Sequence, residues 1–151
     1  MRLFEIQNRP PLPVSGQKPW WVDVLAPMTA ELWSDGWSWT EGGCFAFADR
    51  MQKAYGGQQW CVARFDPEEK DWAAEHAVVK IGGVYYEFHG VFDPQTYVAM
   101  LTRKDKKASK GPYQREMKRK GSPGLFWFED ENLDDTQWKQ LLMVLKTGKL
   151  T

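Results

Sequence analysis

Histidine and cysteine are scarce in this sequence. Its 151 residues contain two of each, and no Cys-x-x-Cys pair is present. Structural zinc sites with the usual ligand spacing are therefore excluded. The two cysteines, Cys44 and Cys61, could form one disulfide, but a cytosolic protein of this size needs none. We expect two free thiols, of which Cys61 is a small buried side chain on a strand.

Charge imbalance and long apolar runs are also lacking. The formal net charge is zero, which argues against a domain whose main task is to bind a polyanion. No segment approaches the roughly 18 consecutive apolar residues of a membrane span. The first 16 residues contain no apolar core of the signal-peptide type and are broken by prolines. We expect a cytoplasmic protein without membrane contact.

Aromatic residues are abundant, with nine Trp, eight Phe and five Tyr. Large rings fill cores, and they also line ligand grooves. With 151 residues, the chain is long enough for one domain with a real core, and we predict a single domain over 1–151. A groove on its surface would be rich in tryptophan.

The residue pattern predicts an α+β fold, in which a helix precedes a mainly antiparallel sheet and further helices follow. Residues 1–19 are expected to be irregular because of their prolines. The expected elements are a short strand at 20–25, a short turn or helix after Pro27, a helix at 43–55, a strand at 60–65, a loop or helical turn at 66–75, strands at 76–81 and 84–89, a helix starting at Pro94, a basic loop at 103–121, a strand at 125–129 and a helix at 134–146.

Cys44 lies in the first turn of the helix predicted at 43–55. Apolar residues recur there at helical spacing, and Cys44 is at one end of that stripe. A helix N-terminus lowers the pKa of a thiol through its dipole and its free N–H groups. Gly42 and Gly43 precede the cysteine and would let a substrate carbonyl approach the backbone, where the Cys44 N–H could donate to an oxyanion.

The two histidines lie on a predicted hairpin around Gly82 and Gly83. Two strand-like runs separated by Gly-Gly indicate a tight turn, which fixes the register. His76 would then lie opposite His89, with Glu87 as its diagonal neighbour on the same face. Cys44 as nucleophile, His76 as proton carrier and Glu87 as the group that orients the imidazole would form a catalytic triad.

These segments, GGCFAFADRMQKAYGG followed by HAVVKIGGVYYEFHG, resemble the papain-like and transglutaminase-like cysteine hydrolase superfamily, including its NlpC/P60-type branch. The similarity is greatest to small uncharacterised bacterial and phage proteins with a G-G-C-x-x-x-A pattern. It covers about residues 40–92. It implies a papain-like fold in which a nucleophilic Cys44 packs against a sheet that bears His76, with a third polar residue on the next strand.

The sequence departs from that pattern in two respects. Glu87 stands where Asp is usual, and no Gln lies shortly before Cys44 to complete a papain-style oxyanion hole. Thr40, or the indole of Trp37 or Trp39, could take that place.

The resemblance implies a cysteine-dependent hydrolase or acyltransferase. It would act on an amide, ester or thioester bond of a peptide, a protein or a small amide, as a peptidase or deamidase, without cofactor or metal.

Other interpretations stay open. A zinc site made by Cys44, His76 and His89 is one alternative. The domain could also be a non-catalytic papain-like one that binds a partner through its Trp-rich surface. The basic residues of 103–120 could contact an acidic partner or nucleic acid, or could form a solvated loop.

Overall fold

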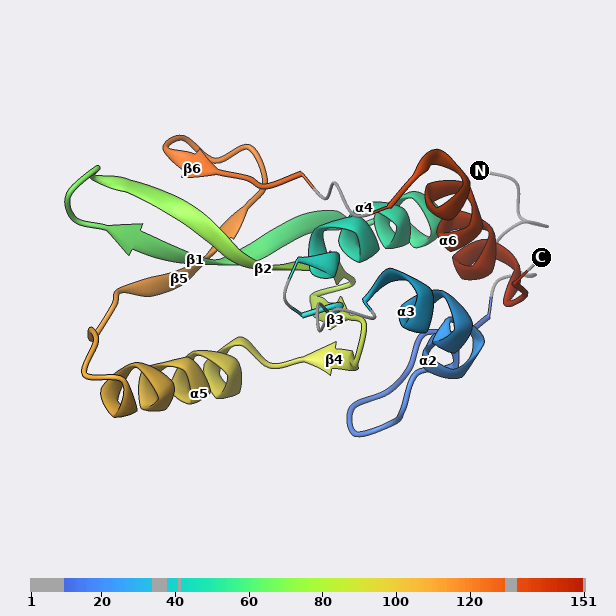
Figure 1. Cartoon of the computed structure of the whole chain (residues 1–151), viewed down its shortest axis with the longest axis horizontal. Coiled ribbons are helices and arrows are strands. Elements are labelled where there is room, and N and C mark those ends of the chain that lie inside the picture. The colour runs from blue at the N-terminus through green and yellow to red at the C-terminus, as the bar shows by residue number, and fades with distance from the viewer. Residues whose placement is uncertain (1–9, 34–37, 41, 130–132, 151) are drawn as a thin grey trace.

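The computed structural model describes residues 10–33, 38–40, 42–129 and 133–150. Within them the chain forms the expected α+β fold, with five helices and six strands (Figure 1). In chain order these are α2 (Trp20–Val24), α3 (Ala26–Leu32), α4 (Gly43–Tyr55), β1 (Gln58–Asp66), β2 (Asp71–Ile81), β3 (Val84–Glu87), β4 (Gly90–Phe92), α5 (Pro94–Lys107), β5 (Arg115–Arg119), β6 (Leu125–Phe126) and α6 (Asp135–Thr147).

The sheet has the strand order β4-β3-β2-β1-β5, and all these neighbours are antiparallel. β1 pairs along almost the whole length of one edge of β2. On the other edge, β3 pairs with residues 79–81 and β6 pairs in parallel with residues 72–73. Among the residues that the structure describes, the stretch 74–78 between them has no strand partner on that side. This gap in the ladder leaves backbone groups that need other partners.

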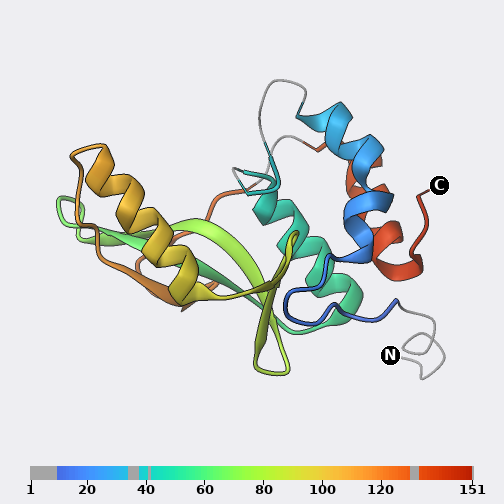
Figure 2. The ribbon, with the colours of Figure 1, turned by 90° about the horizontal axis from the view of Figure 1, so that it is seen from below.

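Helix α4 packs against β2 with most of its first turns buried, and α6 lies alongside α4 (Figure 1). The short helices α2 and α3 flank the same end of the molecule. Helix α5 covers the opposite face of the sheet, as the view from below shows (Figure 2). The aromatic residues fill the space between α2, α3, α4 and the sheet, with Trp21, Trp39 and Phe47 each at most 2% exposed.

Both long C-terminal helices begin at the expected residues. Asp93 caps α5 by accepting from the Gln95 N–H, and Pro94 occupies the first helical position. Helix α6 begins with a capping box in which Asp134 and Gln137 satisfy each other's backbone N–H groups. The expected helix at 43–55 is found at those bounds.

Two sequence-based predictions are wrong in the N-terminal half and the centre. Residues 20–25 form helix α2 and its C-cap instead of a strand, because Trp21 and Leu25 lie one turn apart and are both fully buried. Residues 71–75 belong to β2 instead of a loop, since the strand continues past the acidic turn and pairs with β1 through Asp71.

The basic segment is not one loop. Residues 103–107 are the last turn of α5, and Arg115–Arg119 form the edge strand β5. Lysine and arginine are common on edge strands, where they discourage pairing with another chain. The predicted strand at 125–129 shrinks to the two residues of β6.

Candidate active site

Cys44 is the second residue of α4 and is 2% exposed. The helix N-terminus points at the unpaired stretch of β2, and the amide N–H of Ala77 donates a hydrogen bond to Cys44 Sγ over 3.5 Å. The thiol therefore substitutes for the missing strand partner of β2. The sulfur thus accepts a backbone N–H from β2 while it lies in the first turn of α4.

His76 lies next to this contact on β2 and is 1% exposed. The tight turn has the expected register, with Ile81 opposite Val84 and Val79 opposite Tyr86. His76 Nε2 lies 3.4 Å from Glu87 Oε2. The longer Glu side chain thus reaches the imidazole. The three residues that the sequence predicted as a triad are brought together.

Glu87 lies between the two histidines. Its Oε1 accepts from the His89 backbone N–H at 2.8 Å, and its Oε2 lies 3.3 Å from His89 Nδ1. Burial raises the pKa of this carboxyl, but the hydrogen bonds from His76 and His89 outweigh burial and lower it to about 2. Glu87 is an anion held between the buried His76 and the exposed His89.

His89 does not lie opposite His76 on a paired strand, as the extended hairpin register predicted. β3 ends at Glu87, and His89 lies in the turn to β4 with 60% of its side chain exposed. Its hydrogen bond to Glu87 raises the pKa of His89, while partial burial opposes that shift. The structure assigns it a contact with the carboxylate rather than with the imidazole.

The imidazole of His76 is pulled toward its charged form. Burial alone lowers its pKa, but interactions with the Cys44 thiol and then with Glu87 raise it to about 9. Its Nδ1 is buried and has no hydrogen bond of ordinary geometry within the described part of the chain. With Nε2 directed at Glu87, Nδ1 is the nitrogen left to exchange a proton with the thiol.

Cys61 is the second cysteine, and it differs from Cys44 in its surroundings. Both cysteines are free and buried. Burial raises the pKa of the Cys61 thiol to about 12 and outweighs the opposing effect of Lys118. Cys61 is thus held as a neutral thiol.

Two aromatic rings that sequence reasoning missed cover His76. The ring of Tyr97, one turn into α5, stacks on the imidazole at a centroid distance of 5.0 Å, and Phe92 lies 5.3 Å away. Burial raises the pKa of Tyr97 to about 12, as do Cys44, Glu75 and Glu87. The helix signal Asp93-Pro94 located α5, but no sequence pattern placed its first turn over the histidine.

An ion-pair group holds α5 on the sheet. Arg115 of β5 bonds to Glu75 at 2.6 Å and to Asp105 of α5 at 2.8 Å, and its side chain is 2% exposed. Glu75 precedes His76 and is the extra residue of a β-bulge in β2. The cover over His76 is therefore tied to the strand that carries it.

The residues proposed to complete an oxyanion hole have other partners. The Trp39 indole N–H donates to Thr29 Oγ1 at 2.8 Å, and its ring stacks on Phe88 in the core. The Thr40 hydroxyl is hydrogen bonded to Ser38. Trp37 lies outside the described residues. The Cys44 N–H remains as a candidate donor, because it belongs to the first helical turn.

Gly43 has a packing role instead of giving room to a substrate. A Cβ there would lie 2.6 Å from Cζ2 of the Trp33 indole, and the Gly43 N–H already donates to Ser38 O. The ring of Trp33 occupies the space beside Gly43 where the sequence predicted that a substrate carbonyl could approach.

Within the described ranges, no three His, Cys, Asp or Glu side chains are grouped so that they could hold a metal ion. The alternative zinc site of Cys44, His76 and His89 is not formed. Among the same residues no helix is both long and apolar enough to cross a membrane. No protein-family model matches the chain, and the comparisons with curated proteins and with solved structures give no match.

Proposed function

We propose that this protein is a cysteine-dependent hydrolase or acyltransferase in which Cys44, His76 and Glu87 act together on an amide, ester or thioester. The observation that carries the proposal is the order of contacts around His76. The Cys44 thiol, at the N-terminus of α4, interacts with the buried imidazole of His76. The anionic carboxylate of Glu87 lies 3.4 Å from Nε2 of the same ring. Nucleophile, base and orienting group are the three roles of a thiol triad.

The reaction follows from these positions. The Cys44 proton moves to His76, and the thiolate sulfur attacks the carbonyl carbon to form a C–S bond. The bond from that carbon to the leaving group breaks, and the leaving group takes the proton from the imidazolium. Water, or an acceptor nucleophile, then gives a proton to His76 and attacks the thioester. The acyl product leaves, and the Cys44 thiolate recovers the proton from His76.

Glu87 stabilises the imidazolium between these steps. Its hydrogen bonds from His89 and His76 hold it ionised, so it can orient the ring without taking the proton. The N–H of Ala77 fixes the sulfur before reaction, and the N–H of Cys44 is positioned to donate to the oxygen of the tetrahedral intermediate.

A second candidate is a non-catalytic domain of the same architecture that binds a partner. The observation that favours it is that Cys44 and His76 are only 2% and 1% exposed, so that a substrate reaches them only when a covering element moves. Tyr97 and the start of α5 cover His76, and their displacement would open it.

Acyl-enzyme formation separates the two candidates. After incubation with p-nitrophenyl acetate, intact mass and peptide mapping should find one acetyl group on Cys44, with a matching burst of p-nitrophenol. His76→Ala should abolish the burst. In Cys61→Ala the burst should be unchanged, since the Cys61 thiol is neutral at neutral pH. Equal slow acetylation of lysines in all variants, with none on Cys44, would contradict the hydrolase and leave the binding domain.

A further inference from the structure

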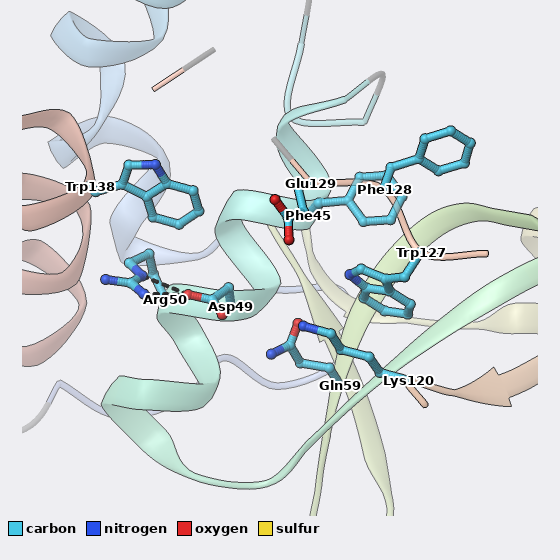
Figure 3. Close-up of a pocket in the computed structure, with 9 residues that line it drawn as sticks. All are labelled: Phe45, Asp49, Arg50, Gln59, Lys120, Trp127, Phe128, Glu129 and Trp138. Carbon is cyan, nitrogen blue, oxygen red and sulfur yellow. Dashed lines mark hydrogen bonds and ion pairs between the residues drawn. The ribbon is translucent and has the colours of Figure 1, made fainter. Parts of the chain in front are cut away.

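A concave site that contains none of Cys44, His76 and Glu87 lies beside α4 (Figure 3). It is a cavity of about 500 Å³ between α4, the start of β1, the segment after β6 and helix α6. Four aromatic residues line it, Phe45, Trp127, Phe128 and Trp138, together with the polar and charged Asp49, Arg50, Gln59, Lys120 and Glu129. Phe128 is 44% exposed, and a ring left in solvent beside other rings is a typical stacking surface.

The base of this cavity holds a buried acceptor without a donor. Gln59 is 7% exposed, and its Nε2 donates to Gln52 Oε1 at 2.7 Å. Its Oε1 is buried, has no hydrogen-bond partner within the described ranges, and points into the cavity in Figure 3. An unpaired buried carbonyl costs free energy, so its presence calls for an explanation. A ligand N–H that enters the cavity would satisfy it.

The cations of the cavity already lie against its rings. Arg50 lies 4.7 Å from the centre of the Trp138 ring, and Lys120 lies 5.4 Å from that of Trp127. Asp49 is neutralised within α4, because its Oδ2 bonds to Arg50 Nε at 2.8 Å. Positive charge beside an indole face suits a ligand that joins a flat ring to an anion.

A smaller polar hollow of about 140 Å³ adjoins the aromatic cavity. The two share Gln59 and Lys120, and the smaller one is also lined by Gln52, Gln58 and Arg119. A ring bound among the indoles and directed at Gln59 would therefore have its anionic group within the reach of Lys120 and Arg119. This is the arrangement of a base and its phosphate.

We infer that this cavity binds a nucleotide unit. The base stacks on Trp127 beside Phe128, its amino N–H donates to Gln59 Oε1, and its phosphate lies at Lys120 and Arg119. The unit can come from a free mononucleotide or from a single-stranded nucleic acid, because both offer the same chemistry. The inference is independent of the proposed hydrolase, because it uses none of Cys44, His76 and Glu87.

Binding can be measured by fluorescence anisotropy of a labelled single-stranded oligo(dA) at fixed ionic strength, with competition by AMP, adenosine and inorganic phosphate. Phe128→Ala alters an exposed ring and should weaken binding several-fold without unfolding. Trp127→Leu should weaken it about tenfold, as loss of one stacking platform does. Gln59→Leu should weaken AMP and oligonucleotide alike but leave inorganic phosphate unchanged.

Trp60→Leu is the matched control, because Trp60 lies on β1 outside the cavity with Lys80 over its ring. Lys104→Ala, which removes a positive charge from α5 outside the cavity, tests whether binding depends on overall positive charge instead of on the cavity. Competition by AMP would identify a mononucleotide site, and binding of the oligonucleotide without such competition a strand site; both support the inference. It would be overturned if neither binds at millimolar concentration, or if Trp60→Leu or Lys104→Ala weakens binding as much as Trp127→Leu and Phe128→Ala do.

Discussion

Cys44 Sγ accepts the backbone N–H of Ala77, the residue that follows His76, and thereby joins the first turn of α4 to the unpaired edge of β2. β3 and β6 leave this stretch of β2 free, so the thiol supplies an acceptor that a neighbouring strand would otherwise supply. The same contact places the sulfur beside the imidazole. The gap in the sheet is thus the reason that the nucleophile and the base meet.

Removal of the Glu87 carboxylate, which contacts His76, should change how the stability of the protein depends on pH. The folded-state pKa of His76 is about 9, above its ordinary 6.5, so its stabilisation is full below pH 6.5 and is lost as the pH rises through 9. That loss amounts to at most about 3 kcal/mol. In Glu87→Gln the imidazole pKa falls, and the loss should shift to lower pH. Urea unfolding from pH 6 to 9.5 measures it; identical pH profiles would show that Glu87 does not hold the imidazolium.

Glu87 itself gives a second dependence at low pH. Its pKa is lowered to about 2 from 4.5, so its stabilisation is present above pH 4.5 and is lost as the pH falls toward 2. His89→Ala removes one of its two imidazole partners and should reduce this acid sensitivity in part. Unfolding midpoints between pH 2.5 and 5 provide the measurement. An acid transition that is unchanged in His89→Ala would leave no role for the His89 contact.

Tyr97 should control access to the buried pair. Tyr97→Ala removes the ring that stacks on His76 and should raise the rate at which iodoacetamide modifies Cys44 several-fold. Tyr97→Phe keeps the ring and should leave the rate unchanged. Peptide mapping of the alkylated protein follows the reaction. Equal rates in wild type and Tyr97→Ala would show that solvent reaches Cys44 by another path.

Arg115 should contribute strongly to stability. Arg115→Met leaves Glu75 and Asp105 without their shared cation in a site where that side chain is 2% exposed, and should cost about 3–5 kcal/mol. The matched change Arg119→Met, at the exposed end of the same strand, should cost less than about 0.5 kcal/mol. Chemical denaturation of both variants measures this difference in the free energy of unfolding. Similar losses in the two variants would contradict a buried ion pair between Arg115 and its two carboxylates.

Packing against Trp33 should prevent a larger side chain at position 43. Gly43→Ala puts a methyl group 2.6 Å from Cζ2 of Trp33, and overpacking of this kind typically costs about 1–3 kcal/mol. Trp33→Leu in the same chain should relieve that clash, so the double variant should be less unstable than the sum of the two single changes. Additive losses would show that Gly43 is required for another reason.

The sequence was sufficient to predict the parts of the site that depend on local signals. Gly82-Gly83 gave the hairpin register near the turn, and the glycines before Cys44 gave the start of α4. It could not predict where β3 leaves β2, which moved His89 into a turn and left Glu87 between the two histidines. It also could not predict that Tyr97 covers His76, since that contact depends on how α5 crosses the sheet.

Composition was also a poor guide to structure where charged residues form strands. The basic residues of β5 occupy an edge strand, and Asp71 begins a long strand because β1 continues opposite it. In both places tertiary pairing outweighed local propensity. Gln59 gave no signal at all, because an orphaned carbonyl is recognised only once its surroundings are known.

The most direct test of the thiol–imidazole pair is the pH dependence of Cys44 alkylation by iodoacetamide in a Cys61→Ala background, with and without His76→Ala. The pair predicts that alkylation of Cys44 begins at a lower pH with His76 present than in His76→Ala. Identical pH profiles in the two proteins would contradict the activated thiol.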